Sequence, residues 1–105
     1  GKYLNGKKPT NSRFTLWPKR FSRHNTKRGE EAIKKYVKLS KKYNLKPSVF
    51  ANAFVLSRPF LTSSIIGATS LKQLDENISS ININFTDEMM SDVQNIHLSD
   101  PNPCY

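Results

Sequence analysis

The chain has 105 residues, enough for one small domain, and its hydrophobic share of 36% predicts a thin core. We find no signal peptide, no transit-like leader and no apolar run near the roughly 20 residues that span a bilayer, so we expect a cytoplasmic protein without membrane insertion. The single cysteine, Cys104, excludes an internal disulfide. One cysteine and two distant histidines do not make up a ligand set, so we expect no metal site.

The formal net charge of +9 is concentrated in the first half of the chain. Residues 1–46 contain 15 Lys and Arg against 2 Asp and Glu, whereas residues 47–105 contain 2 against 6. A basic half indicates either a polyanionic partner, such as nucleic acid, an anionic membrane or a phosphorylated ligand, or a solvated Lys-rich surface. The composition leaves both interpretations open.

Residues 1–26 are predicted to form a long loop, because Gly6, Pro9 and Pro18 interrupt them and no apolar period emerges. Aromatic and basic side chains are interleaved along this stretch. Loops of this length are uncommon in compact domains unless they have a function. We therefore expect a functional loop.

Four helices are predicted after this loop, at residues 27–43, 47–57, 70–80 and 86–97. Thr26 begins the first and Asn44 ends it, Pro47 lies in the first turn of the second, and Thr86 caps the last. The helical spacing of apolar residues predicts which positions are buried. These positions are Ile33, Tyr36, Val37, Leu39, Val49, Phe50, Ala53, Phe54, Leu56, Met89, Met90, Val93 and Ile96.

Between the second and third helices, residues 63–66 are predicted to form a short buried strand. One strand cannot form a sheet. Either the chain is nearly all helical, or its strand belongs to a sheet that is supplied elsewhere.

The segment Ile65–Asn77 is the most informative for chemistry, because a strand turns through Gly67 into a helix. Such a turn directs free backbone N–H groups and the positive end of the helix to one point, which suits a phosphate. At about 100° per residue, the polar and apolar side chains of this helix fall on opposite sides. The polar side has Thr69, Gln73, Glu76 and Asn77, and the apolar side, expected to anchor the helix, has Leu71, Leu74, Ile78 and Ile81. Taken alone, this arrangement is more often a solvated surface than a nucleotide site.

The same segment resembles the last strand and following helix of the aldo-keto reductases. It is most similar to the branch that holds the potassium-channel beta subunits and related bacterial reductases. That branch shows the pattern I-x-G-A-[ST]-x-x-x-Q-L-x-E-N at this place. Three more segments agree in order along nearly the whole chain. Gly1-Lys2-Tyr3 is similar to the S-G-K-Y that follows the seventh strand of the family, and Asn11–Phe14 is similar to an S-R segment of the same loop. Lys46–Pro59 resembles the paired helices before the final strand.

This resemblance implies an α/β fold, the C-terminal part of a (β/α)8 barrel. The chain would supply the loop after strand 7, helix 7, strand 8, helix 8 and the C-terminal helix, and would be mostly helical on its own. Residues 1–105 would form the NADP-binding portion of one domain, with a cofactor-covering loop at 1–26 and the last barrel elements and C-terminal helix at 27–105. Its partner would be the N-terminal rest of the barrel.

The resemblance also implies NADP as the cofactor, since the family binds NADP across the barrel mouth with its adenosine 2′-phosphate end at the loop after strand 8. Phosphate sites of such barrels commonly lie at the loops after strands 7 and 8. Gly67, Thr69 and Gln73 would face the 2′-phosphate and ribose. Glu76 and Asn77 would hold the adenine edge.

Charge for the cofactor phosphates would come from the long loop, where Lys2 and Arg13 match the positions of the family. Because matching Arg13 needs a one-residue insertion, Arg20 and Arg23 are the alternatives.

Catalysis in the family uses an Asp, a Tyr, a Lys and a His from the early and middle strands, and none of those motifs can be placed in this chain. We therefore expect no catalytic residue in it, and expect the parent protein to reduce aldehydes and ketones to alcohols with NADPH. The expected partners are NADP(H) and a small carbonyl substrate, without nucleic acid. Two alternatives remain, a regulatory subunit like the channel beta subunits and a basic nucleic-acid-binding module.

Overall fold

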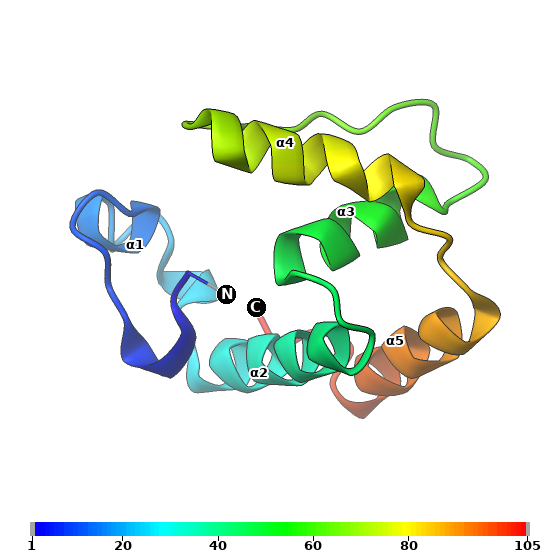
Figure 1. The fold of residues 1–105 in the computed structure, drawn as a ribbon. Helices are drawn as coiled ribbons and strands as arrows, with labels where there is room; N and C mark the ends of the chain where they lie inside the picture. Colours follow the sequence, from blue (N-terminus) through cyan, green and yellow to red (C-terminus); the bar gives the residue numbers. More distant parts are fainter. Residues whose placement is uncertain (1, 105) are drawn as a thin grey trace.

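The computed structural model describes residues 2–104, and all regular structure in this part of the chain is helical (Figure 1). The α-helices are α1 (Arg13–Leu16), α2 (Lys27–Lys42), α3 (Pro47–Leu56), α4 (Leu71–Ser79) and α5 (Asp87–Ser99). Three 3-10 helices span Leu4–Gly6, Ser22–His24 and Ser80–Asn82. The four predicted helices are confirmed to within two residues at each end. None of the described helices is both long and apolar enough to cross a membrane.

Capping interactions at both ends set the bounds of α2. The hydroxyl of Thr26 accepts a hydrogen bond from the backbone N–H of Gly29 at 2.9 Å and donates one to the carbonyl of Pro103 at 3.1 Å. At the other end, Asn44 takes the left-handed conformation with φ of 55°. The N–H of Leu45 then bonds to the carbonyl of Ser40 at 2.9 Å, which is the Schellman arrangement that closes a helix.

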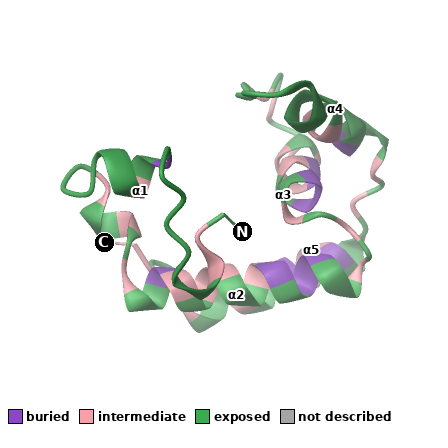
Figure 2. Ribbon diagram, turned by 60° about the vertical axis from the view of Figure 1, so that its left-hand side comes forward, coloured by how far each residue is buried: buried purple, intermediate pink, exposed green. Residues whose placement is uncertain are grey.

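The hydrophobic core lies where α2, α3 and α5 meet, as Figure 2 shows. Leu39, Phe50, Met89 and Val93 are its buried centre. Partly buried side chains surround them: Tyr36, Tyr43, Leu45, Phe54, Phe85 and Ile96. These residues come largely from the predicted apolar stripes. Leu56 is the exception, because it is 40% exposed and the prediction of its burial was wrong.

A polar cluster ties α2 to α5 beside this core. The ammonium of Lys42 lies 2.7 Å from a carboxylate oxygen of Asp92 and 3.0 Å from one of Glu88. The hydroxyl of Tyr43 donates to the same oxygen of Asp92 at 2.6 Å. Hydrogen bonds from Lys42 and then Tyr43 hold the pKa of the Asp92 carboxyl below its ordinary value.

Two predictions about the connecting segments were wrong. Residues 63–66 form no strand in the described part of the chain, and Ile65 is fully exposed at 100% instead of buried. A strand requires backbone partners on a neighbouring strand, and no other strand lies within residues 2–104 to provide them. The predicted loop at 1–26 contains three short helical turns, and Tyr3 stacks on Phe14 there with ring centroids 3.9 Å apart.

Candidate functional site

The turn into α4 is closed by its own side chains. Ser70 caps the helix by accepting from the N–H of Gln73 at 3.3 Å. The backbone N–H and the hydroxyl of Thr69 both donate to the side-chain oxygen of Gln73, at 2.9 Å and 3.0 Å. Two donors therefore converge on a single oxygen at the exposed, positive end of a nine-residue helix.

Gly67, just before this turn, leaves open space beside its backbone. A Cβ placed on it would have no other atom within 4 Å. The residue is exposed, and its φ is not in the left-handed region. Neither packing nor backbone conformation within the described chain requires a glycine at this position. What the glycine does provide is free access to the backbone.

The next turns of α4 direct two polar side chains at α3. A carboxylate oxygen of Glu76 lies 2.6 Å from the ammonium of Lys46, the residue that precedes α3. The second oxygen of Glu76 accepts from the hydroxyl of Ser48 at 3.4 Å. The hydrogen bond from Lys46 lowers the pKa of Glu76, so its carboxylate stays ionised and remains an acceptor.

Asn77 connects α3 to the turn. Its side-chain oxygen accepts from the amide N–H of Asn52 at 2.9 Å. Its side-chain nitrogen donates to the carbonyl of Gly67 at 3.4 Å. A carbonyl oxygen can only accept, so the nitrogen of Asn77 must face Gly67 and the oxygen must face Asn52.

Five of the predicted site residues thus lie on α4 or just before it, in three separate groups of contacts, and we call them the α4 set. They are Gly67, Thr69, Gln73, Glu76 and Asn77. Lys2 and Arg13 are exposed and lie in the segment around α1, which is well separated from α4 in both overall views (Figures 1 and 2). The alternatives Arg20 and Arg23 belong to the same segment, where Arg23 donates to the ring of His24 at 3.1 Å.

The prediction that the apolar side of this helix anchors it was wrong. The four apolar residues of the predicted stripe are exposed to solvent. The exposed fractions are 85% for Leu71, 39% for Leu74 and 57% for Ile78 on α4, and 74% for Ile81 in the following 3-10 helix. The helix instead packs its polar side on α3, through Glu76 and Asn77. Within residues 2–104 this apolar side stays largely open to solvent, and hydrogen bonds and an ion pair join the polar side to α3.

The sequence analysis missed three contributors to these contacts: Lys46, Ser48 and Asn52. Asn52 carried a usable signal, because it is the only amide within the otherwise apolar run of α3. An amide in such a run needs a polar partner when it is partly buried. Lys46 carried none, because eleven lysines precede Pro47 and nothing in the sequence separates this one from the rest.

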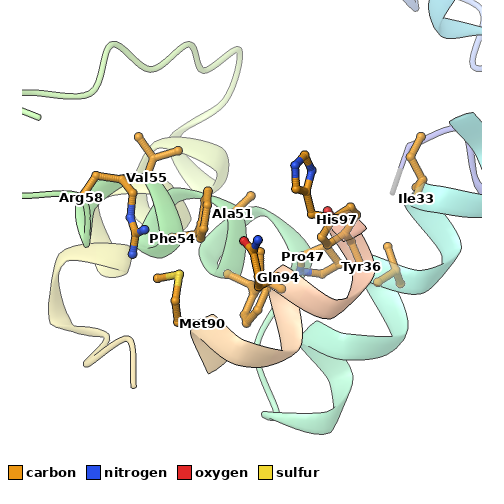
Figure 3. Close-up of a pocket in the computed structure, with 13 residues that line it drawn as sticks. Ile33, Tyr36, Pro47, Ala51, Phe54, Val55, Arg58, Met90, Gln94 and His97 are labelled. Atoms are coloured by element: carbon orange, nitrogen blue, oxygen red, sulfur yellow. The ribbon is translucent and has the colours of Figure 1, made fainter. Parts of the chain in front are cut away.

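Away from the α4 set, an apolar groove of about 660 Å³ lies between α2, α3 and α5 (Figure 3). Tyr36, Phe54 and Met90 contribute to its walls, and Arg58 lies over the ring of Phe54 at 5.0 Å. The groove shares no lining residue with the α4 set. Among residues 2–104, no group of three or more His, Cys, Asp and Glu side chains could hold a metal ion.

Comparison with known proteins covers nearly the whole chain. The model of the aldo/keto reductase family matches residues 2–97. "Protein tas" of Escherichia coli (strain K12) is 36% identical over 97 residues, which is 92% of this chain and 28% of that protein. "Aldo-keto reductase" of Babesia bovis is 35% identical over 102 residues, covering 92% of this chain and 35% of that protein. The chain therefore spans about a third of the length of these relatives, and it belongs to the aldo/keto reductase family.

Proposed function

We propose that this chain is the C-terminal, nucleotide-binding portion of an NADP(H)-dependent reductase that converts aldehydes and ketones to alcohols. Its family implies a (β/α)8 barrel and oxidoreductase chemistry. The observation that carries the proposal is the α4 set. Its members occur in the order of the family motif. Gly67, Thr69 and Gln73 lie at the exposed start of α4, and Glu76 and Asn77 follow on the side of the helix that faces α3.

The chemistry of this helix end suits a phosphate monoester. Thr69 directs a backbone N–H and a hydroxyl at one oxygen of Gln73, and a phosphate oxygen can take the place of that amide oxygen. The positive end of α4 favours the negative charge. Gly67 leaves the backbone accessible to a ligand.

The chemistry of Glu76 and Asn77 suits the base of the same nucleotide. An ionised carboxylate accepts from an exocyclic amine, and a side-chain amide N–H donates to a ring nitrogen. In our proposal Lys2 and Arg13 add positive charge from the loop at 1–26. For these two side chains to reach the cofactor, the loop must lie near α4 in the assembled barrel.

No residue of this chain is assigned a catalytic role. The proton donor of carbonyl reduction belongs, in this proposal, to the N-terminal rest of the barrel, which also forms most of the carbonyl pocket. The chain contributes cofactor binding alone, and it does not reduce carbonyls by itself.

The proposal is tested by titrating the chain with adenosine 2′,5′-bisphosphate and with adenosine 5′-monophosphate in a calorimeter. One charge-assisted hydrogen bond contributes about 1.5–3 kcal/mol, so the bisphosphate should bind roughly tenfold to a hundredfold more tightly. Thr69→Val removes the hydroxyl with little change of shape and should reduce this ratio. Equal affinity for the two nucleotides, or no binding of either, would refute the proposal.

A further inference from the structure

Two polar side chains that face α4 come from α3, and neither belongs to the motif that identifies the family. Asn52 is partly buried within the apolar run of α3, and Lys46 precedes the first turn of that helix. Both bond directly to the residues of α4 that are proposed to meet the base. These two bonds determine which groups Glu76 and Asn77 present to a ligand.

The bond from Asn52 fixes the polarity of the Asn77 side chain. With its oxygen held by Asn52, Asn77 presents only N–H groups to a ligand. One of these groups points to the carbonyl of Gly67 at the long distance of 3.4 Å, so it is weakly engaged. Without Asn52, the amide could turn and present its oxygen instead.

The contact from Lys46 has a complementary effect on Glu76. It occupies one carboxylate oxygen at 2.6 Å, while the other has only the long contact of 3.4 Å to Ser48. The adjacent positive charge keeps the carboxylate ionised, as its lowered pKa indicates. The Glu76 side chain keeps 21% of its surface exposed, and its second oxygen has the weaker of the two contacts.

We infer that Lys46 and Asn52 are positioning residues that set the base specificity of the nucleotide site, by making Glu76 an acceptor and Asn77 a donor. Adenine offers an amine that donates and ring nitrogens that accept, and it matches such a pair. A base with a carbonyl in place of the amine would direct an acceptor at the Glu76 carboxylate, and it is disfavoured. This inference rests on the proposed function.

The first test compares adenosine 2′,5′-bisphosphate with inosine 2′,5′-bisphosphate, which carries a carbonyl where adenosine carries the amine. The chain should prefer the adenosine ligand. Lys46→Met should reduce this preference by about fivefold to tenfold, the effect of about one hydrogen bond, and Lys46→Arg should restore it. Lys38→Met is the matched control, since it removes an exposed lysine of α2 and should leave the preference unchanged.

Asn52 is tested by two substitutions with opposite chemistry. Asn52→Leu removes the donor, and Asn52→Asp offers only acceptors, so the Asn77 amide should reverse in the latter. Each substitution should lower the affinity for adenosine 2′,5′-bisphosphate by about fivefold, the effect of one lost hydrogen bond to the base. Asn95→Leu, at an exposed position of α5, is the matched control and should not change the affinity.

A separate readout distinguishes positioning from a general effect on folding. In Lys46→Met the pKa of Glu76 should rise towards its ordinary value, as followed by carbon NMR of the labelled carboxyl group. Binding of the adenosine ligand should then decline at a higher pH than in the parent chain, because protonated Glu76 no longer accepts with both oxygens. An unchanged melting temperature shows that the fold is retained.

The outcomes separate the two claims. If the parent chain binds neither bisphosphate, the proposed function fails and this inference fails with it. If the parent chain binds and prefers adenosine but Lys46→Met and Asn52→Leu retain both affinities, the inference alone is overturned.

Discussion

Thr26→Ala should destabilise the chain more than the loss of a helix cap alone. The hydroxyl of Thr26 caps α2 through the N–H of Gly29 at 2.9 Å and also donates to the carbonyl of Pro103 at 3.1 Å. A cap contributes about 1 kcal/mol and a second hydrogen bond contributes about 1 kcal/mol, so the free energy of unfolding should fall by about 2 kcal/mol. Gly29 is buried, so water cannot easily replace the lost acceptor.

Thr86→Ala is the matched comparison, because Thr86 caps α5 through the N–H of Met89 at 3.3 Å and its hydroxyl bonds to no distant segment within residues 2–104. Thr86→Ala should lower the free energy of unfolding by about 1 kcal/mol. Thr26→Ser should lower it by less than either alanine substitution, because it keeps the hydroxyl. Urea unfolding followed by circular dichroism measures all three variants. Equal costs for Thr26→Ala and Thr86→Ala would refute the claim that Thr26 ties the C-terminal segment to α2.

Three further predictions follow from the core, the α2–α5 cluster and the proposed site. Phe50→Ala should lower the free energy of unfolding by about 3–5 kcal/mol, because Phe50 is only 4% exposed, and the same urea assay measures this. Because the pKa of Asp92 is depressed, its ionised carboxylate contributes to the free energy of unfolding above the ordinary carboxyl pKa. This contribution is lost as the pH falls through the depressed value. Asp92→Asn should therefore flatten the acid limb of a stability–pH curve. In the assembled reductase, Arg13→Ala should reduce the NADPH-over-NADH affinity ratio by roughly tenfold or more, whereas Glu76→Ala should weaken both cofactors equally. An unchanged ratio in Arg13→Ala would transfer the role to another loop arginine.

The helices were predictable because their signals are local. Thr26, Pro47 and Thr86 mark helix starts through bonds or ring geometry within one turn, and Asn44 marks an end through its left-handed backbone. The apolar stripes of α2, α3 and α5 converge on one core, so burial followed from spacing at most positions. These features depend on few residues beyond their own helix.

Local spacing did not predict the absence of the strand or the orientation of α4. The strand needs neighbouring strands that residues 2–104 do not supply, and the orientation of α4 follows side-chain bonds to α3. Ile65 can be buried in a strand only if neighbouring strands cover it, and it is fully exposed. Leu71 was expected to anchor α4, but the bonds of Glu76 and Asn77 to α3 oriented the helix instead. Of the α4 set, Thr69 and Gln73 meet at the helix start, whereas Glu76 and Asn77 bond to α3; their role in binding a nucleotide stays a prediction.

The apolar side of α4 is consistent with the proposed place of this chain in a barrel. Leu71 and Ile81 are 85% and 74% exposed, and Ile65 in the preceding segment is wholly exposed. Burial of such side chains contributes about 1.5–3 kcal/mol each. A barrel completed by the N-terminal portion would offer them a covering surface.

The most direct measurement of the central claim is an NMR titration of the labelled chain with NADPH, following the backbone amides of residues 2–104. We expect the largest shifts at Gly67, Thr69 and Gln73, with smaller shifts at the same amides on addition of NADH. Shifts confined to the apolar groove between α2, α3 and α5, or equal responses to the two cofactors, would contradict it.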